Sequence, residues 1–529
     1  MSAKAQIKEV MGELPFAAEL YWLLRNPGKK AFNRFNLEDL KIHLPKMIMD
    51  TTPFAQSDPA GKKVFLFVYL HFWIKHAIAI GLTLRGLGYE VTLGYLPYGD
   101  FAKPVNRFDA QRQNLYARDI LGKARNLLTP ISFLDLESAS EMPELLARAV
   151  EQVTVFDTQY ILQNEEVTGT EPVYIFRHER NMDAACKALA YFQKNRPDVV
   201  VIANGMIQEF GAVYETARFL DIQTVTYEFG EQDQRIWFGH NSLVINHNTD
   251  NLWTTCEDRI LNNEQRSWLD TFLAGRQGLS TGTQFSHLWQ KTGRDGGEKT
   301  HLALGLDERP VVLLPTNVLG DSATLGLTSF NRSMAEWVER TVLFFAPRSE
   351  VQLVIRIHPG ETLTIGPSVA DLVRITLPEL PSHIRLIGPK EKINTYDLMD
   401  FADLALVYTT TAGLEMAVRG IPVLVSGKAH YRQKGFTLDA ETWQEYFAIL
   451  SNVLKEPLAY RLTQAQVERA LNYCYFYFRE YARPFPWHLE KLWPSLEKRP
   501  ISYVLSPEGR AEFEPTFREM TGESVKWML

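Results

Sequence analysis

The sequence predicts an α/β protein with two doubly wound lobes. Apolar, strand-like runs alternate with helical segments in two separate parts of the chain, and a polar, Gly-rich stretch lies between them at residues 276–301. Strands that alternate with helices in this way favour parallel sheets, in which ligands bind beyond the carboxyl ends of the strands. We therefore expect two Rossmann-like lobes with a ligand in the cleft between them.

Composition narrows the class of protein. The chain has 56 Lys and Arg against 63 Asp and Glu, a net charge of -7, which indicates neither a strongly basic nucleic-acid binder nor an acidic tail. The three cysteines, Cys186, Cys256 and Cys474, are too far apart for a CxxC metal knuckle or a disulfide framework. The N-terminus lacks the apolar core of a signal peptide. We expect a cytoplasmic protein.

The first lobe begins with the apolar stretch 64–84. His71, Lys75 and His76 interrupt this stretch, so it predicts a buried strand followed by a helix rather than a membrane span. Residues 105–165 are richer in charge and in helical spacing, and we expect a helical insertion there. The alternation then resumes with helix 181–194, strand 198–204, helix 206–220 and strand 222–228.

The second lobe repeats the alternation. Its expected strands are 311–315, 351–357, 383–387, 403–408 and 421–426, with helices at 333–345 and 411–419. The predicted organisation is a helical appendage at 1–60, a first lobe at 61–280, a linker at 281–301, a second lobe at 302–455, and C-terminal helices at 456–529 that pack back on the first lobe. Clustered aromatic residues in the last segment favour such packing.

The segment YTTTAGLEMAVRG is the most informative part of the second lobe. A buried strand ends in Thr409, Thr410 and Thr411, and a helix begins at once, so hydroxyls and free backbone N–H groups converge where the helix dipole favours an anion. Gly413 has no side chain to keep a ligand from the backbone, and Glu415 lies one turn after Thr411, where a carboxylate suits ribose hydroxyls. A threonine N-cap followed by a helix-start glutamate explains the same residues equally well.

Two other strand ends lie at the same predicted edge. Strand 351–357 runs into His358 and a proline, which holds the imidazole at the edge of the sheet, and Arg356 shares its face. Thr316 and Asn317 follow the first strand of this lobe. Together these side chains predict a phosphate site, although a lone histidine is more often structural.

A basic loop, GKAHYRQKG, follows the last recognised strand. It holds Lys428, Arg432 and Lys434 within seven residues, and these cations suit a diphosphate. A solvated basic loop is the alternative interpretation.

The order RxHPxE, a strand, and then YTTTAGLEMAVRGIPVLVSGKAHYRQKGFT resembles the donor lobe of GT-B glycosyltransferases, most closely the bacterial capsule polysaccharide biosynthesis proteins. These proteins include 3-deoxy-manno-octulosonate transferases and are similar to the HP-motif sialyl- and polysialyltransferases. The resemblance covers about residues 305–440.

The resemblance implies roles for several residues. It implies that His358 contacts the donor phosphate and that Thr409–Thr411 form the hydroxyl motif, with threonines in place of a serine pair. It also implies that Glu415 takes the place of the acidic residue that often holds the donor ribose. GT-B enzymes usually stabilise the leaving diphosphate with helix ends and cations, so we expect no metal site and no cofactor, with the nucleotide sugar as a substrate.

The general base is less defined, because the first lobe lacks a clear Asp/Glu-Asp/Glu-Gly motif. The carboxylates considered are Glu209, Glu228, Glu231 and Asp233. The first two are preferred, because Glu209 lies in the first turn of the helix after Asn204 and Gly205, and Glu228 ends a strand. Either carboxylate is a candidate to accept the proton of an acceptor hydroxyl, and either also fits an ordinary helix-start or loop position.

The sequence thus predicts a bacterial glycosyltransferase that moves a sugar from a nucleotide-activated donor to a surface polysaccharide or its lipid-linked precursor. The alternatives are a UDP-N-acetylhexosamine 2-epimerase-like enzyme, a CDP-polyol phosphotransferase and a non-catalytic nucleotide-sugar-binding assembly protein. We expect a glycan or glycolipid acceptor and no nucleic acid. Peripheral association with the inner face of the membrane, the sugar, the nucleotide base, the stereochemistry and the oligomeric state are left open.

Overall fold

The structure is a computed structural model, and it describes residues 3–24, 35–278, 285, 292–364 and 366–524. The chain forms two compact units. Unit 1 comprises residues 1–157, 169–245 and 483–526, and unit 2 comprises residues 158–168, 246–482 and 527–529. Residues 281–284 and 286–291 of the predicted linker 281–301 lie outside the described residues, and unit 2 contains its described part.

Unit 1 is built on a seven-stranded sheet in the order β13-β6-β5-β4-β1-β2-β3. Its strands are β1 (Lys63–Tyr69), β2 (Glu90–Leu96), β3 (Thr129–Ser132), β4 (Val199–Ala203), β5 (Gln223–Glu228), β6 (Arg235–His240) and β13 (Arg483–Pro484). The strands from β3 through β5 are parallel, whereas β6 and β13 are antiparallel to their neighbours. The parallel strands thus have the 3-2-1-4-5 order of a doubly wound sheet, whose ligand crevice lies where the order reverses, between β1 and β4.

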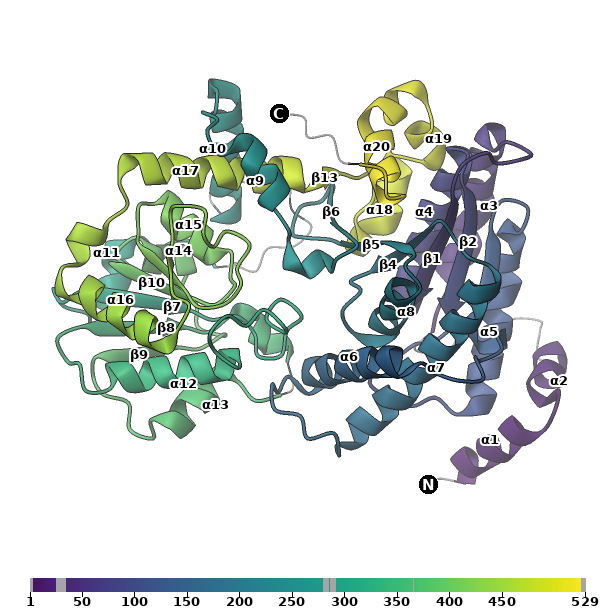
Figure 1. Ribbon diagram of the computed structural model, residues 1–529, viewed down its shortest axis with the longest axis horizontal. Coiled ribbons are helices and arrows are strands. Elements are labelled where there is room, and N and C mark those ends of the chain that lie inside the picture. Colours follow the sequence, from purple (N-terminus) through teal and green to yellow (C-terminus); the bar gives the residue numbers. More distant parts are fainter. Residues whose placement is uncertain (1–2, 25–34, 279–284, 286–291, 365, 525–529) are drawn as a thin grey trace. The chain divides into compact units, whose positions relative to one another are not determined.

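Most helices of unit 1 surround this sheet, and the two N-terminal helices pack on another helix instead (Figure 1). The helices are α1 (Ala3–Glu13), α2 (Ala17–Leu24), α3 (Glu38–Thr51), α4 (His71–Gly86), α5 (Arg107–Leu121), α6 (Glu144–Leu162), α7 (Pro172–Lys194), α8 (Gln208–Phe219), α18 (Leu492–Lys498), α19 (Ile501–Val504) and α20 (Pro507–Met520). Helix α4 is buried from Trp73 to its end because it packs on β1 and β2, as the strand-then-helix interpretation of 64–84 requires. None of the described helices is long and apolar enough to cross a membrane.

The segment predicted as a helical insertion contains a strand. Between α5 and α6, β3 pairs with β2 in parallel register, from Thr129 opposite Thr92 to Ser132 opposite Tyr95. This strand has four residues, includes Pro130 and lies at the edge of the sheet. Because a strand this short has no apolar alternation, its pattern could not separate it from the helices on either side.

Unit 2 has a six-stranded, fully parallel sheet in the order β12-β11-β10-β7-β8-β9. Its strands are β7 (Val311–Pro315), β8 (Gln352–Arg356), β9 (Ile384–Ile387), β10 (Leu404–Val407), β11 (Val423–Val425) and β12 (Leu438–Asp439). Its helices are α9 (Asp250–Cys256), α10 (Asn263–Arg276), α11 (Gly297–Ala303), α12 (Met334–Phe345), α13 (Val369–Thr376), α14 (Thr395–Met399), α15 (Ala412–Val418), α16 (Trp443–Lys455) and α17 (Gln464–Tyr475). The doubly wound order recurs, and its switch point lies between β7 and β10. The predicted fold class is confirmed.

The aromatic C-terminal stretch contributes to both units. Helix α17 and the π-helix Phe476–Tyr481 belong to unit 2, where their aromatic side chains are largely buried. From Arg483 onward the chain belongs to unit 1: β13 joins the edge of the sheet, and the last helices pack within that unit. The segment 456–529 is therefore divided between the units.

Candidate active site

The switch point of unit 2 brings three strand ends together. The Thr316 hydroxyl, after β7, accepts a hydrogen bond from the backbone N–H of His358, after β8, at 3.1 Å. Asn317 Oδ1 accepts one from the backbone N–H of Thr409, after β10, at 3.3 Å. The predicted residues of these three loops thus lie at one edge of the sheet.

The hydrogen bonds of His358 define its tautomer. Its Nδ1 accepts a hydrogen bond from the Gly360 backbone N–H at 3.0 Å, so the proton of the neutral ring is on Nε2. Burial, together with the nearby Arg356, lowers the pKa of His358 to about 4. His358 is therefore a neutral hydrogen-bond donor near pH 7.

Arg356 is a buried cation, with 3% of its surface exposed. Its Nη1 donates to the Gly388 carbonyl at 2.5 Å, and its Nε has no partner. Among the described residues, no carboxylate forms an ion pair with it, and burial lowers the pKa of its guanidinium. Because a buried charge is costly unless it is paired, this position is suited to an anion from outside the chain.

The three threonines are not equivalent. The Thr409 hydroxyl donates to the Ala323 carbonyl at 2.8 Å, so its proton is committed within the protein. Thr410 Oγ1 accepts a long hydrogen bond from the Ala412 backbone, and Thr411 is the N-cap of α15 without a side-chain capping bond. The structure therefore favours Thr410 and Thr411 as hydroxyl donors.

Gly413 serves a different purpose from the one predicted. A Cβ at this position would lie 2.3 Å from the hydroxyl oxygen of Tyr431. That hydroxyl donates to the Thr410 carbonyl at 2.6 Å. The space left by the missing side chain is thus filled by the protein itself, which fixes the turn after β10.

Glu415 also differs from its predicted role at a ribose. Its side chain is buried and forms an ion pair with Arg276 of α10. It also accepts a hydrogen bond from the Tyr396 hydroxyl at 3.1 Å. Because its charge is already compensated inside unit 2, the carboxylate is not presented to a ligand.

The cations of the loop after β11 are mostly neutralised. Arg432 donates to Ser329 at 3.0 Å and to Glu441 at 3.0 Å, and Lys434 is ion-paired with Asp250. Lys428 is exposed and has no carboxylate partner among the described side chains. Of this loop, Lys428 best retains the charge expected of a diphosphate contact.

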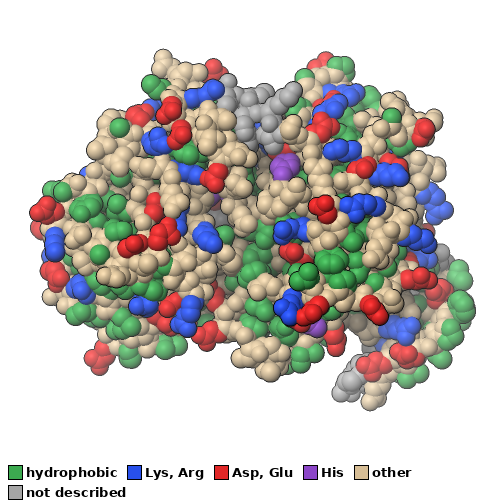
Figure 2. Space-filling view, viewed as in Figure 1, with side chains coloured by type: hydrophobic (Ala, Val, Ile, Leu, Met, Phe, Trp, Pro, Cys, Tyr) green, Lys and Arg blue, Asp and Glu red, His purple; other side chains and the backbone are tan. Residues whose placement is uncertain are grey.

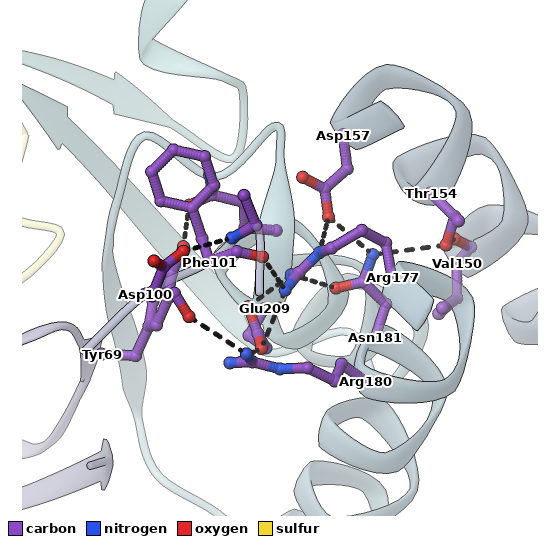
Figure 3. A network of polar contacts seen from close by, with 12 residues as sticks. Tyr69, Asp100, Phe101, Val150, Thr154, Asp157, Arg177, Arg180, Asn181 and Glu209 are labelled. Carbon is purple, nitrogen blue, oxygen red and sulfur yellow. Dashed lines mark hydrogen bonds and ion pairs between the residues drawn. The ribbon is translucent and has the colours of Figure 1, made fainter. Parts of the chain in front are cut away.

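Unit 1 contains a buried charge network that includes Glu209 (Figure 3). The Glu209 carboxylate is ion-paired with Arg177 at 2.6 Å and also with Arg180, and none of its surface is exposed. Arg177 Nε bonds to Asp157 at 2.6 Å, and Asn181 donates to the same carboxylate at 3.2 Å. This enclosure removes Glu209 from the reach of an acceptor hydroxyl.

Charges in the network are mutually compensated. Burial opposes the ionisation of Glu209, but Arg177 and Arg180 outweigh it and hold the pKa of Glu209 below its ordinary value. Burial likewise opposes the charge on Arg177, yet Asp157 and Glu209 raise its pKa. An acid that is held ionised and enclosed is a structural group rather than a general base.

Glu228 is the other candidate base. It is the last residue of β5, is partly exposed, and its Oε1 accepts a hydrogen bond from the Phe229 backbone N–H at 3.0 Å. Its catalytic role remains a prediction. The described residues contain no group of three or more His, Cys, Asp or Glu side chains placed to hold a metal ion.

Sequence reasoning gave no role to Glu361, the last residue of RxHPxE. One carboxylate oxygen accepts a hydrogen bond from the Val369 backbone N–H at 3.2 Å, and the other is buried without a partner. Burial raises the pKa of Glu361 to about 7. Its position in the RxHPxE motif could have marked Glu361 as a candidate, but the sequence does not show that its carboxyl group is buried.

Comparisons with known proteins agree with the predicted resemblance. Residues 284–481 match the family model described as "Capsule polysaccharide biosynthesis protein". No curated protein matches the chain.

Three solved structures illustrate the structural similarity. The beta Kdo 2,4 transferase of Thermosulfurimonas dismutans KpsC is 15% identical, with 52% of this chain and 78% of that chain covered and a TM-score of 0.35. The beta Kdo 2,7 transferase of the same protein is 12% identical over 54% and 79%, with a TM-score of 0.32. The UDP-GlcNAc 2-epimerase from Neisseria meningitidis, bound to UDP-GlcNAc, is 12% identical over 77% and 97%, with a TM-score of 0.30.

The strand order and the sequence match define the class. The protein has two doubly wound α/β units, and the greater part of its second unit is similar to the capsule polysaccharide biosynthesis proteins.

Proposed function

We propose that this protein is a glycosyltransferase of capsule or other surface-polysaccharide assembly, which transfers a sugar from a nucleotide-activated donor to a glycan or its lipid-linked precursor. The match of residues 284–481 supports the biosynthetic setting. The observation that carries the proposal is the buried Arg356, which forms no ion pair among the described residues, beside the neutral His358 at the switch point of unit 2. A leaving phosphate would supply the missing negative charge.

In the proposed reaction, the bond between the anomeric carbon and the phosphate oxygen breaks, and the electron pair stays on the phosphate. The acceptor oxygen forms the new bond to the anomeric carbon, and its proton passes to a base, for which Glu228 is the remaining candidate. Arg356 and the Nε2–H of His358 stabilise the charge that grows on the leaving oxygen. Thr410, Thr411 and Lys428 are the further donors. Such preorganised donors are usually the largest contribution to catalysis.

The first test measures donor binding. Purified protein is titrated calorimetrically with CMP, CDP, UDP and GDP, and we expect one of them to bind. Arg356→Met should weaken that binding at least about tenfold, because it removes a charge-assisted contact. Arg385→Met is the matched control, since Arg385 of β9 donates to the backbone carbonyl of Leu304 at 3.0 Å at another position in the same sheet. Equal binding by wild type and Arg356→Met would remove the basis of the proposal.

The second test separates transfer from epimerisation. The protein is incubated with the sugar form of the nucleotide that binds, with and without a polysaccharide acceptor. A transferase releases the nucleotide only when the acceptor is present and extends the glycan, whereas an epimerase converts the free nucleotide sugar on its own. Conversion without an acceptor would replace the proposed activity with the epimerase alternative.

A further inference from the structure

Asp321 is an acidic residue of unit 2 that has no ion-pair partner among the described residues. Figure 2 shows acidic and basic side chains interspersed over the surface in view, so the acids there lie among cations. Asp321 instead lies half-buried in the loop between β7 and α12, residues 316–333. Burial raises the pKa of its carboxyl group above the ordinary value, and hydrogen bonds from its own turn only partly offset this. Its negative charge is therefore less compensated than that of Glu415, which is paired with Arg276.

One oxygen of the Asp321 carboxylate is used inside the protein. Its Oδ1 accepts hydrogen bonds from the Ala323 backbone N–H at 3.2 Å and from the Ser322 hydroxyl at 3.3 Å. Its Oδ2 has no hydrogen-bond partner among the residues that the structure describes. An asparagine would hold the same turn through its side-chain oxygen. The turn alone thus does not require a carboxylate, and the second oxygen is left for a ligand.

Hydrogen bonds attach this turn to the candidate site. The Ala323 carbonyl accepts a hydrogen bond from the Thr409 hydroxyl at 2.8 Å. Further along the same loop, the Leu327 carbonyl accepts one from the backbone N–H of Lys428, also at 2.8 Å. Asp321 therefore belongs to a loop that lies against both the threonine motif and the loop that carries Lys428. Connections longer than about 15 residues in compact domains are usually functional.

The charge of Asp321 restricts the groups that it can bind. A carboxylate beside a phosphate site repels the phosphate itself, because the two carry like charges. An ionised carboxylate only accepts hydrogen bonds, so it suits ligand groups that donate them. A nucleotide sugar has such donors next to its phosphate groups, namely the hydroxyls of the ribose and those of the transferred sugar.

We propose that Asp321 binds the donor by accepting hydrogen bonds from its hydroxyl groups at the free carboxylate oxygen. Asp321 would thus have the kind of role that the sequence predicted for Glu415. The inference rests on the proposed function, since the ligand is the nucleotide-sugar donor. It adds a specificity-determining residue, which selects phosphate ligands that carry hydroxyl groups.

The test measures ligand binding calorimetrically for wild type and for Asp321→Asn, which keeps an oxygen for the turn and removes the charged acceptor. The nucleotide probes are CMP, CDP, UDP and GDP, and the nucleotide-sugar probes are CMP-N-acetylneuraminate, CDP-glucose, UDP-GlcNAc and GDP-mannose. We expect Asp321→Asn to weaken the binding of the nucleotide that wild type binds, or of its nucleotide sugar, about tenfold or more, because a charge-assisted hydrogen bond is lost. Removing an acid near a phosphate would by itself strengthen anion binding, so the expected sign excludes a general effect of charge.

Two further probes identify the hydroxyl groups. Dideoxyribonucleotides lack both ribose hydroxyls, and if Asp321 binds the ribose, wild type and Asp321→Asn should bind them equally. If Asp321 binds the transferred sugar, only the nucleotide sugar should bind the variant more weakly. Inorganic pyrophosphate has no sugar hydroxyls, and the variant should bind it at least as tightly as wild type does.

Asp371→Asn is the matched control. Asp371 of α13 is an exposed carboxylate of unit 2 that likewise accepts a hydrogen bond within a turn, from the Ser368 hydroxyl at 2.6 Å. This variant should bind every probe like wild type, and unfolding midpoints of both variants establish that they are folded.

Two results would overturn the inference and leave the proposed function standing. One is that Asp321→Asn binds the nucleotide and its nucleotide sugar as tightly as wild type or more tightly. The other is that pyrophosphate binding falls by the same factor as nucleotide binding. A wild type that binds none of the nucleotides or nucleotide sugars would contradict both the inference and the proposed function.

Discussion

The two units use the edges of their sheets in opposite ways. Beside the switch point of unit 1, Arg177 is buried and is paired with both Asp157 and Glu209. At the switch point of unit 2, Arg356 is equally buried but has no carboxylate partner among the described residues. The same residue type is therefore a structural element in one unit and a candidate ligand contact in the other. What distinguishes the two is the supply of counter-charge by the protein itself.

The largest effect is expected when the buried cation of unit 1, Arg177, is removed. Arg177→Met should lower the free energy of unfolding by about 3–5 kcal/mol, because it leaves buried carboxylates unpaired. Chemical denaturation measures the change. The exposed Arg148, which pairs with Glu144, is the control, and Arg148→Met should cost no more than about 1 kcal/mol.

The loss in Arg177→Met should also depend on pH. Without the guanidinium, the native pKa values of the carboxylates rise above their unfolded values, so the native state takes up protons first. The deficit should therefore shrink as the pH is lowered and grow as it is raised. A deficit that is constant with pH would indicate lost packing rather than lost charge compensation.

The corresponding change in unit 2 should separate stability from function. Arg356→Met should leave the free energy of unfolding within about 1 kcal/mol of wild type, because no buried carboxylate loses its partner. Turnover in the sugar-transfer assay should nevertheless fall at least about 100-fold. His358→Ala should likewise lower turnover strongly while changing the free energy of unfolding little. An unfolded Arg356→Met variant would mean that the two arginines have the same structural role.

A smaller effect is expected at the turn after β10. Gly413→Ala should cost about 1–3 kcal/mol, since the new methyl group meets the Tyr431 hydroxyl. In a Tyr431→Phe background the cost should be smaller, because the obstructing oxygen is gone. Gly293→Ala is the control, as no atom lies within 4 Å of a Cβ placed there. Equal stability costs in both backgrounds would show that the cost of Gly413→Ala does not come from contact with the Tyr431 hydroxyl.

The smallest expected effect is the contribution of Glu361 to the pH dependence of the free energy of unfolding. Its pKa in the folded protein is raised to about 7 by burial, so between pH 5 and 7 the unfolded state loses its proton before the native state does. Its contribution to stability should therefore decline as the pH rises through this range. Glu361→Gln should remove this decline, and the exposed Glu350→Gln should retain it. Denaturation curves recorded across this pH range make the comparison, and parallel curves for wild type and Glu361→Gln would contradict the raised pKa.

Much of the fold could be predicted from local pattern. The apolar runs that became β1, β4, β7, β8 and β10 are buried on both faces of their sheets, so their sequences are continuous and easily recognised. Strand β3 was missed because it is short, contains Pro130 and lies at an edge. The point at which the chain returns from unit 2 to unit 1 was also hidden, since α17 and its aromatic residues resemble the helices that follow them.

The candidate site was only partly predictable, because the sequence shows which residues follow strands but does not show which partners the fold brings to them. His358, Thr316, Asn317 and Thr409 follow strands of one parallel sheet, and their strand ends necessarily lie at one edge. Glu209, Glu415 and Arg432 also lie near strand ends in the sequence, but in the structure each is neutralised by partners brought to it by the fold.

The sequence by itself determined the alternation of strands and helices, the two lobes and the polar motifs at the strand ends, because these depend on neighbours a few residues apart. Only the tertiary structure decided which charges are compensated. Glu415 meets Arg276 across 139 positions of the chain, and Arg177 meets Glu209 across 32. The Coulomb energy of a buried group depends on distance in space, and spacing along the chain does not specify that distance.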